Sequence, residues 1–380
     1  MKDAWFRLKA AVIRFKYKYI LKEIFFLQDP EIVHERMVRV GHFLGKHAWS
    51  RSLVRWLFFY QHHMLEQRVA GLTFKNPIGL AAGFDKEAQL TQILPEVGFG
   101  FMEAGSVTGV ACNGNPRPWL WRLPKSRALV VNYGLKNDGS EAISRRLKKM
   151  QFAFPVGVSL AKANSPDTVE EQKGIADYLK AYKTFSAEGV GDYFTINISC
   201  PNAFGGEPFT DPAKLDRLLA ALDISNKKKP VFIKMPADLT IAALDEILAV
   251  ARKYKVTGFV STNLTKQRNS GKISAEDKLP EKGGISGKVV EDLANEQIAY
   301  IYKKTGKEFV IMGCGGVFSA VDAYKKIRLG ASLIQMITGM IFEGPEIIGL
   351  INHDLVRLLK RDGFASIIEA VGADFKPKSR

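Results

Sequence analysis

A cysteine set between two asparagines is the part of this sequence that most clearly predicts chemistry. The segment reads Asn197-Ile198-Ser199-Cys200-Pro201-Asn202 and follows an apolar, strand-like run that begins at Tyr193. A thiolate can remove a proton from carbon, and flanking carboxamides can hold a flat polar substrate against it. A free cysteine at a strand end can also be an inert, buried small side chain. This segment alone leaves both interpretations open.

Two lysines also follow strand-like runs. Lys86 comes after Ala81-Ala82-Gly83-Phe84-Asp85, and Lys234 comes after Val231-Phe232-Ile233. Most lysines are solvated surface groups, but an ammonium that closes a buried strand faces the end of the sheet. There it can stabilise the negative charge of a reduced flavin ring or hold a substrate carboxylate. We therefore expect both lysines to be functional.

Eight short apolar runs alternate with helical stretches from residue 76 onward. They cover residues 77–83, 99–106, 156–160, 193–199, 231–235, 258–263, 309–316 and 333–339. Eight strand–helix units predict an α/β fold, a (β/α)8 TIM barrel whose site lies at the carboxyl ends of the strands. Periodicity alone does not exclude a doubly wound sheet. The barrel is favoured because useful residues end nearly every run: Asp85 and Lys86, Ser106, Ser159, Asn197 with Cys200, Lys234, Thr262 with Asn263, Gly315 with Gly316, and Thr338 with Gly339.

Glycines mark the ends of the last two predicted strands. Gly313, Gly315 and Gly316 lie at one end, and Thr338-Gly339 lies at the next. The loops after strands seven and eight of such a barrel commonly bind phosphate, because bare backbone amides approach an anion closely. Glycines are also common turn residues, but two consecutive strands with this feature predict a phosphorylated cofactor such as flavin mononucleotide (FMN).

Residues 1–70 lack this repeat and predict a helical module ahead of a barrel domain at 71–380. Asp29-Pro30-Glu31 is a favourable helix start, with Asp as N-cap and Pro in the first position. This helix is expected to continue toward Gly41, and another is expected from Trp49 to Gln67.

The basic charge of the chain is concentrated partly in its first residues. The formal net charge is +16, from 55 Lys and Arg against 39 Asp and Glu. An apolar helical face surrounded by basic residues is predicted near the N-terminus. The apolar residues are Trp5, Leu8, Val12, Phe15 and Tyr19. The basic residues around them are Lys9, Arg14, Lys16, Lys18 and Lys22. Such a helix can lie on an anionic membrane surface. It can also dock on its own domain. Nucleic acid is not an expected partner, because no recognised binding motif accompanies the charge.

The cysteines indicate neither a disulfide framework nor a metal site. Cys112, Cys200 and Cys314 are too few and too scattered for either, which suggests a reducing compartment. No apolar run approaches membrane-spanning length, and no secretory signal pattern is present. We expect no bound metal.

Several long motifs together resemble the dihydroorotate dehydrogenases, most closely the membrane-associated, quinone-reducing class 2. Leu27-Gln28-Asp29-Pro30-Glu31-Ile32-Val33-His34-Glu35 is similar to the N-terminal motif of that class. The other matching segments are residues 71–86, Asn115-Pro116-Arg117-Pro118 with Trp121-Arg122-Leu123, residues 197–202, Gly283-Gly284-Ile285-Ser286-Gly287, and Gly313-Cys314-Gly315-Gly316. The resemblance runs nearly from end to end.

The resemblance implies a role for each matching residue. Cys200 would remove the C5 proton of dihydroorotate while a hydride passes from C6 to flavin N5, and Lys86 would contact both flavin and substrate. The implied flavin positions are Ala82, Gly83, Lys86, Ser106, Ser159, Asn197, Lys234, Thr262, Gly287, Gly316, Ile337 and Thr338. The implied substrate positions are Lys86, Asn132, Asn197, Asn202 and Asn263. His34 and Arg122 would lie at a tunnel for ubiquinone or menaquinone.

The resemblance also implies a place in the cell and a pathway. The protein would be a peripheral membrane protein on the cytoplasmic face of a bacterial-type inner or cell membrane. It would serve pyrimidine biosynthesis, with dihydroorotate and orotate as substrate and product.

This chain departs from the class 2 pattern at several positions. Class 2 enzymes place Ser where this chain has Cys200; since a thiol is more acidic than a hydroxyl, activity should persist to lower pH. Ser159 replaces a flavin-binding Asn, Leu264 a substrate-side Thr, and Ile337 a flavin-contacting Tyr. In the loop Val131-Asn132-Tyr133-Gly134-Leu135-Lys136-Asn137, the substrate asparagine is one position closer to the glycine than in the family.

Two alternatives therefore remain at this point. One is an FMN oxidoreductase on the same barrel with a changed cyclic substrate or a non-quinone acceptor. The other is a non-catalytic, membrane-associated ligand-binding protein, which would require Cys200 to be inert.

Overall fold

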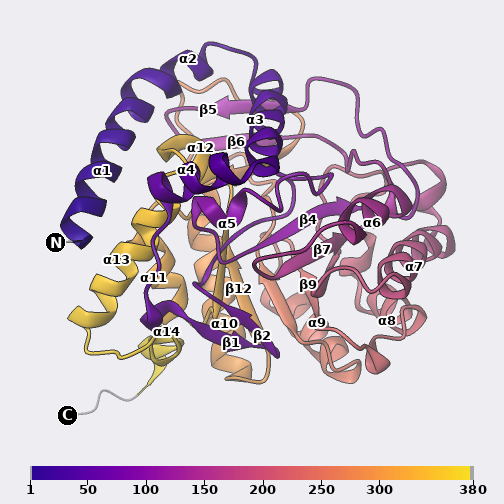
Figure 1. Cartoon of the computed structure of the whole chain (residues 1–380). Coiled ribbons are helices and arrows are strands. Elements are labelled where there is room, and N and C mark those ends of the chain that lie inside the picture. Colours follow the sequence, from indigo (N-terminus) through magenta and orange to yellow (C-terminus); the bar gives the residue numbers. More distant parts are fainter. Residues whose placement is uncertain (1, 377–380) are drawn as a thin grey trace.

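A closed barrel of eight parallel strands forms the centre of the computed structural model, which describes residues 2–376 (Figure 1). The strands are β3 (Ile78–Leu80), β4 (Phe101–Val107), β7 (Val156–Leu160), β8 (Tyr193–Asn197), β9 (Val231–Lys234), β10 (Gly258–Ser261), β12 (Val310–Cys314) and β13 (Leu333–Met336). They pair in the order β10-β12-β13-β3-β4-β7-β8-β9. Each lies within one of the eight predicted runs or extends it by one residue, which confirms the predicted barrel.

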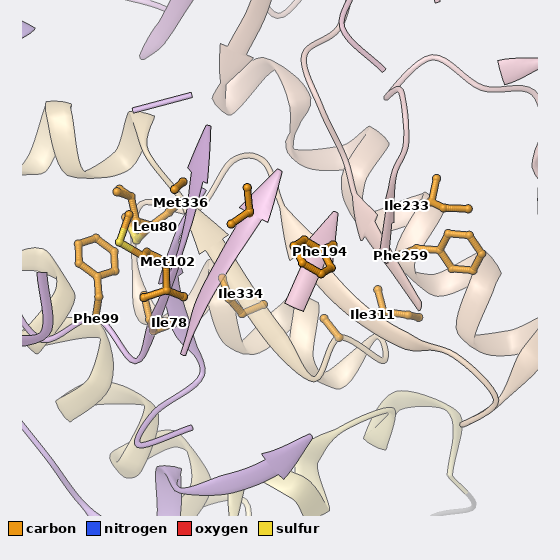
Figure 2. Close-up of a cluster of buried hydrophobic side chains, with 14 of the residues drawn as sticks. Ile78, Leu80, Phe99, Met102, Phe194, Ile233, Phe259, Ile311, Ile334 and Met336 are labelled. Carbon is orange, nitrogen blue, oxygen red and sulfur yellow. The ribbon is translucent and has the colours of Figure 1, made fainter. Parts of the chain in front are cut away.

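Helices cover the outside of the barrel. They are α5 (Leu94–Val97), α6 (Ser140–Lys148), α7 (Glu171–Ala187), α8 (Pro212–Ala221), α9 (Ile241–Lys253), α10 (Glu291–Thr305), α11 (Ala320–Arg328), α12 (Thr338–Glu343), α13 (Ile347–Arg361) and α14 (Ile367–Ala370). The largest apolar cluster fills the layer between strands and helices, and Figure 2 shows part of it, including Ile78, Met102, Phe194 and Phe259. Strands buried on both faces require the continuous apolar runs seen in the sequence.

Aromatic side chains fill the barrel interior, and glycines make room for them. The Phe101 ring occupies the space beside Gly79, where a Cβ atom would lie 2.4 Å from the ring. The Tyr193 ring fills the space beside Gly157 in the same way. The hairpin of β1 (Gln67–Val69) and β2 (Leu72–Phe74) packs Phe74 against Phe101, with ring centroids 5.4 Å apart. The predicted domain boundary at residue 70 falls in the turn of this hairpin.

A three-stranded antiparallel sheet was not predicted from the sequence. It consists of β5 (Leu120–Leu123), β6 (Ala128–Val131) and β11 (Gly284–Gly287), in the order β11-β6-β5. β5 and β6 are close in sequence, but β11 follows β6 by more than 150 residues, so local periodicity carries no signal of the pairing between β6 and β11. This sheet supplies one wall of the site described below.

The N-terminal segment is helical, as predicted. It contains α1 (Lys2–Lys16), a π-helical stretch at Tyr17–Leu21, α2 (Lys22–Phe26), α3 (Pro30–Lys46) and α4 (Ala48–Phe58). The Asp29 side chain accepts hydrogen bonds from the backbone N–H of Glu31 (2.8 Å) and Ile32 (3.2 Å), which confirms the predicted N-cap.

Two predicted helix ends in this segment are wrong. The first helix continues past Gly41 to Lys46, because Gly41 lies where the helix packs closely on Leu90; a Cβ atom at Gly41 would be 2.7 Å from Leu90 Cδ2. The second ends at Phe58 rather than Gln67. There the backbone becomes extended, and Tyr60 packs against Phe6 with ring centroids 5.2 Å apart.

The predicted apolar face of α1 is not the face that docks on the barrel. The helix packs through the buried residues Phe6 and Ala10, and Tyr17 donates a hydrogen bond to the Ile341 carbonyl oxygen (2.7 Å). The carboxylate of Glu343, itself buried, binds Arg14 and Lys18 at 2.6 Å each. The predicted apolar residues Trp5, Leu8, Val12, Phe15 and Tyr19 are all exposed.

Candidate functional site

A single large cavity opens at the carboxyl ends of the barrel strands. Its empty volume is about 1300 Å³, part of which is open to solvent. Its lining includes most of the predicted cofactor positions and most of the predicted substrate positions. The predicted site residues that line it are His34, Ala82, Gly83, Lys86, Ser106, Asn197, Cys200, Asn202, Lys234, Thr262, Asn263, Gly287, Gly316, Ile337 and Thr338.

Three predicted site residues do not line this cavity. Ser159 is fully buried behind it, where its hydroxyl shares a hydrogen bond with the Ser106 hydroxyl (2.8 Å). The Asn132 carboxamide oxygen accepts a hydrogen bond from Asn115 Nδ2 (3.0 Å) and is thereby engaged within the protein. Arg122 lies outside the lining, and its Nη1 donates to the Gln28 carbonyl oxygen (2.8 Å).

Cys200 faces the cavity from the loop after β8. Its thiol is half-buried by exposed area, since one side meets the cavity while protein surrounds the others. Burial raises the pKa of this thiol to about 11, because a thiolate is poorly solvated there. Cys200 is therefore a protonated thiol at neutral pH before a substrate binds. The sequence predicts that a cysteine base keeps the enzyme active to lower pH than a serine base would. Burial works against this effect, because it raises the pKa of the thiol.

Lys86 is positioned by an aromatic ring on the far side of the cavity. Its ammonium lies 3.4 Å from the centroid of the Tyr133 ring, a cation–π contact. Burial first, and then the charge of Lys136, lower the pKa of Lys86 to about 8. Lys86 is thus still mainly charged at neutral pH and can bind a carboxylate. Lys136 also lines the cavity, and the sequence analysis did not assign it a role.

A connected set of polar side chains joins β4, β8 and β10 at the cavity floor. Asn197 Nδ2 donates to the Ser106 hydroxyl oxygen (2.8 Å), and Asn197 Oδ1 accepts from the Ser199 hydroxyl (3.0 Å). Asn263 Nδ2 donates to the Ser199 carbonyl oxygen (2.7 Å). These bonds fix the two carboxamides that the resemblance assigns to substrate.

A second asparagine group shapes the loop on the opposite wall. Asn115 Nδ2 donates to the Asn202 carbonyl oxygen (3.0 Å), and Asn164 Nδ2 donates to Asn115 Oδ1 (2.8 Å). Asn202 Nδ2 in turn donates to the Val131 carbonyl oxygen (2.7 Å). Sequence reasoning did not identify Asn115 or Asn164 as site residues. Asn115 belongs to the motif Asn115-Pro116-Arg117-Pro118, but only the fold shows that it contacts both Asn132 and Asn202.

The wall facing Lys86 is more apolar than the resemblance implies. Val131 and Leu264 line the cavity at the positions where the family places polar side chains. Leu264 packs over β11, where a Cβ atom at Gly284 would lie 2.7 Å from Leu264 Cβ. A substrate in this part of the cavity meets fewer hydrogen-bond donors than in the family pattern.

The residues at the cavity floor suit a flavin phosphate and ring. Gly315 and Gly316 have φ of 115° and 73°, a backbone region that favours glycine. They form a bare surface after β12, beside Thr338. The buried ammonium of Lys234 lines the floor, as does Gln335, whose Oε1 has no hydrogen-bond partner among residues 2–376. The Lys234 ammonium suits a flavin ring that gains negative charge on reduction, and Gln335 Oε1 can accept a hydrogen bond from an N–H group of that ring.

The other end of the cavity is apolar and runs toward the N-terminal helices. Its lining includes Leu120, Leu129, Val317, Phe318 and Ile341. His34 on α3 lines the cavity as well, with its ring edge-on to Phe84 at 4.8 Å between centroids. Its ring is also 6.3 Å from the Tyr133 ring that contacts Lys86, so His34 lies near the Lys86 side of the cavity too. Burial, with a smaller contribution from Lys86, lowers the pKa of His34 to about 3, so its imidazole is neutral.

Within the described part of the chain, no group of three or more His, Cys, Asp and Glu side chains could hold a metal ion. No helix in residues 2–376 is both long enough and apolar enough to cross a membrane.

The fold and the site define a (β/α)8-barrel enzyme with a cavity between its strand ends and an N-terminal helical segment. The family model for dihydroorotate dehydrogenase matches residues 64–359. The chain therefore belongs to the dihydroorotate dehydrogenase family, which confirms the resemblance and makes it a member of a flavoenzyme family.

The chain is similar over most of its length to proteins named dihydroorotate dehydrogenase (quinone). A dihydroorotate dehydrogenase (quinone) of Nostoc punctiforme is 38% identical over 378 residues, covering 95% of this chain and 99% of the relative. Another of the same name from Natronomonas pharaonis is 40% identical over 304 residues, covering 80% and 84%. The crystal structure of the Eimeria tenella enzyme with ferulenol superposes with a TM-score of 0.79 at 27% identity, covering 92% of this chain and 96% of that one.

Proposed function

We propose that this protein oxidises dihydroorotate to orotate with bound FMN and passes the electrons to a membrane quinone. The observation that carries the proposal is the arrangement of Cys200, Lys86, Asn197 and Asn263 around one end of a cavity whose other end is apolar. Proton removal, carboxylate binding and amide recognition need those groups within reach of one ring. The family and the names of the relatives support the same reaction.

Each residue then has a defined task. Lys86 binds the substrate carboxylate, and Asn197, Asn202 and Asn263 orient the ring. Cys200 Sγ takes the C5 proton. When bound, FMN accepts the C6 hydride, and Lys234 stabilises the negative charge that accumulates on the ring.

The electron acceptor enters, in this proposal, from the apolar end beside His34. A neutral imidazole there can hydrogen-bond a quinone oxygen without the cost of burying a charge. Arg122 closes this end from outside: its guanidinium lies 4.7 Å from the Phe26 ring centroid.

The N-terminal helices supply a surface for the membrane that carries the quinone. Among the residues that the structure describes, fifteen of the twenty-one exposed large hydrophobic side chains lie between Trp5 and Trp56. Residues 1–60 carry twelve Lys and Arg against five Asp and Glu. An exposed apolar surface with basic surroundings fits peripheral attachment to an anionic leaflet. Attachment at the cytoplasmic face, and a role in pyrimidine synthesis, follow from the same proposal.

One observation favours a second candidate, an FMN enzyme with a related but less polar cyclic substrate. Val131 and Leu264 line the wall, and the Asn132 carboxamide is held by Asn115.

A turnover assay separates the two candidates. FMN-loaded protein, supplied with dihydroorotate and a short-chain ubiquinone in detergent, should form one orotate for each quinone reduced. Protein that holds FMN and binds the quinone but forms no orotate would contradict the first candidate and favour the second.

A further inference from the structure

A small recess lies behind Cys200, on the far side from the main cavity. Leu135, Asn197 and Cys200 line both spaces and form the wall between them. The rest of the recess is enclosed by the end of β7, by α7 and by the loop that follows Cys200; these residues are Ala161, Lys162, Tyr178, Ile198, Ala203, Gly206, Pro208 and Phe209. The tasks assigned above do not involve this recess.

Lys162 is a buried cation in this recess. It follows β7 by two residues and is only 3% exposed. Its Nζ donates to the Phe204 carbonyl oxygen (2.8 Å), in the same loop that carries Cys200. The backbone after β7 and the hydrogen bond to the loop that carries Cys200 therefore hold the Lys162 ammonium in the recess.

No carboxylate among residues 2–376 forms an ion pair with Lys162, although buried lysines are usually paired. The carboxylate that acts on it most, Asp177, is occupied elsewhere. Asp177 accepts backbone hydrogen bonds from Gly109, Val110 and Ala163. The charge of Lys162 is thus only partly compensated. Two other ionisable groups border the recess: Tyr178, whose hydroxyl donates to the Asn197 carbonyl oxygen (2.7 Å), and Cys200.

The other ionisable groups that act on Cys200 disfavour its thiolate. Glu207, which is paired with Lys266 at 3.2 Å, and Cys112 both raise the pKa of Cys200, whereas Lys162 lowers it. Burial lowers the pKa of Lys162. The charges of Cys200, Asp177 and Cys112 raise it and so favour the ammonium form. Lys162 is therefore the cation placed to hold a thiolate at Cys200.

We propose that Lys162 is a positioning residue that stabilises the Cys200 thiolate from the recess side. The inference rests on the proposed function, in which Cys200 is the base. In that step the C5–H and C6–H bonds of the substrate break and the C5=C6 double bond and an Sγ–H bond form, while the C6 hydride would go to bound FMN as the two-electron oxidant. The thiol then releases its proton to water, and the thiolate forms again beside the ammonium.

The test is the pH dependence of Cys200 alkylation by iodoacetamide in the purified holoenzyme, followed by peptide mass. Lys162→Gln keeps an N–H donor for the Phe204 carbonyl but removes the charge. It should move the alkylation midpoint up by about one pH unit or more, which lowers the rate at pH below the midpoint by about tenfold. Lys162→Arg keeps the charge and should stay near the wild-type midpoint. Lys173→Gln, an exposed lysine on α7, should change nothing.

A wild-type midpoint in Lys162→Gln, or equal shifts in the Gln and Arg variants, would overturn the proposal and leave Lys162 as a loop anchor. If Lys162→Gln does not fold, Lys162→Met in the same assay decides. Alkylation needs no dihydroorotate, so this test is independent of turnover. If the alkylation midpoint rises in Lys162→Gln but the wild-type protein forms no orotate, the proposed function is wrong and the Lys162–Cys200 interaction still holds.

Discussion

The chemistry expected of Cys200 depends on its surroundings more than on its type. A thiol is intrinsically acidic, but burial raises the pKa of Cys200 to about 11. At neutral pH only a small fraction is thiolate, and that fraction grows as the pH rises toward the pKa. The sequence showed the thiol and its flanking amides, whereas the desolvation comes from residues that only the fold brings around it.

The first prediction is a rising pH–rate profile. The rate of flavin reduction by dihydroorotate should increase by roughly tenfold per pH unit from about 6 to about 8, because the thiolate fraction does. Above pH 8 the Lys86 ammonium, whose pKa is lowered to about 8, is progressively lost, and the rise should level off. Stopped-flow absorbance under anaerobic conditions measures this rate. A profile that is flat over the same interval would exclude Cys200 as the base.

The second prediction concerns removal of that base. Cys200→Ala should lower the flavin reduction rate by about 10²–10⁴-fold, the usual contribution of a general base. FMN content and dihydroorotate affinity should stay near those of the wild type, because neither depends on the proton step. Wild-type rates in this variant would show that Cys200 is inert.

The third prediction addresses the apolar wall. Val131→Asn restores a carboxamide where the loop meets the substrate, and a gained hydrogen bond of about 1 kcal/mol lowers KM for dihydroorotate by about fivefold. Val131→Ala is the matched control and should not lower KM. An unchanged or higher KM in Val131→Asn would favour the less polar substrate.

At the scale of elements, α1 presents two faces with different uses. Periodicity correctly identified the apolar set from Trp5 to Tyr19 but did not show that Phe6 and Ala10, on another face, make the contact with the barrel. That information lies in Tyr60 and His353, which are distant in sequence and stack against Phe6 at 5.2 and 5.8 Å. The pairing of β11 with β6 was missed for the same reason.

The fourth prediction separates the two faces of α1. Leu8→Ser with Phe15→Ser should reduce co-sedimentation with vesicles of anionic phospholipid, because both side chains are exposed on the outer face. Thermal stability should hardly change. Val321→Ser, also exposed but on α11, is the control and should bind vesicles normally. Full vesicle binding by the double variant would contradict membrane contact through this face.

Phe6→Ala should give the opposite result. Removing a buried ring costs about 3 kcal/mol of unfolding free energy, measurable by urea denaturation, while vesicle binding persists as long as α1 remains docked. A variant as stable as the wild type would show that the Phe6 contact is not important for docking.

At the scale of the whole molecule, a single cavity links the proton-transfer end at Cys200 to the apolar end at His34, next to the exposed N-terminal helices. The eight strands were predictable because each coincides with an apolar run. Most lining residues were predictable because they lie at the ends of those runs. Asn132, Ser159 and Arg122 do not line the cavity, because each side chain is held by a partner distant in sequence: Asn115, Ser106 and Gln28, respectively. The local sequence pattern carries no signal of these partners.

The most direct measurement is an anaerobic titration of the FMN-loaded protein with dihydroorotate, followed by the absorbance of oxidised flavin. The account predicts rapid bleaching that is complete at one dihydroorotate per flavin and is reversed by adding ubiquinone or menaquinone. An absorbance that stays constant at excess dihydroorotate, with FMN still bound, would contradict the central claim.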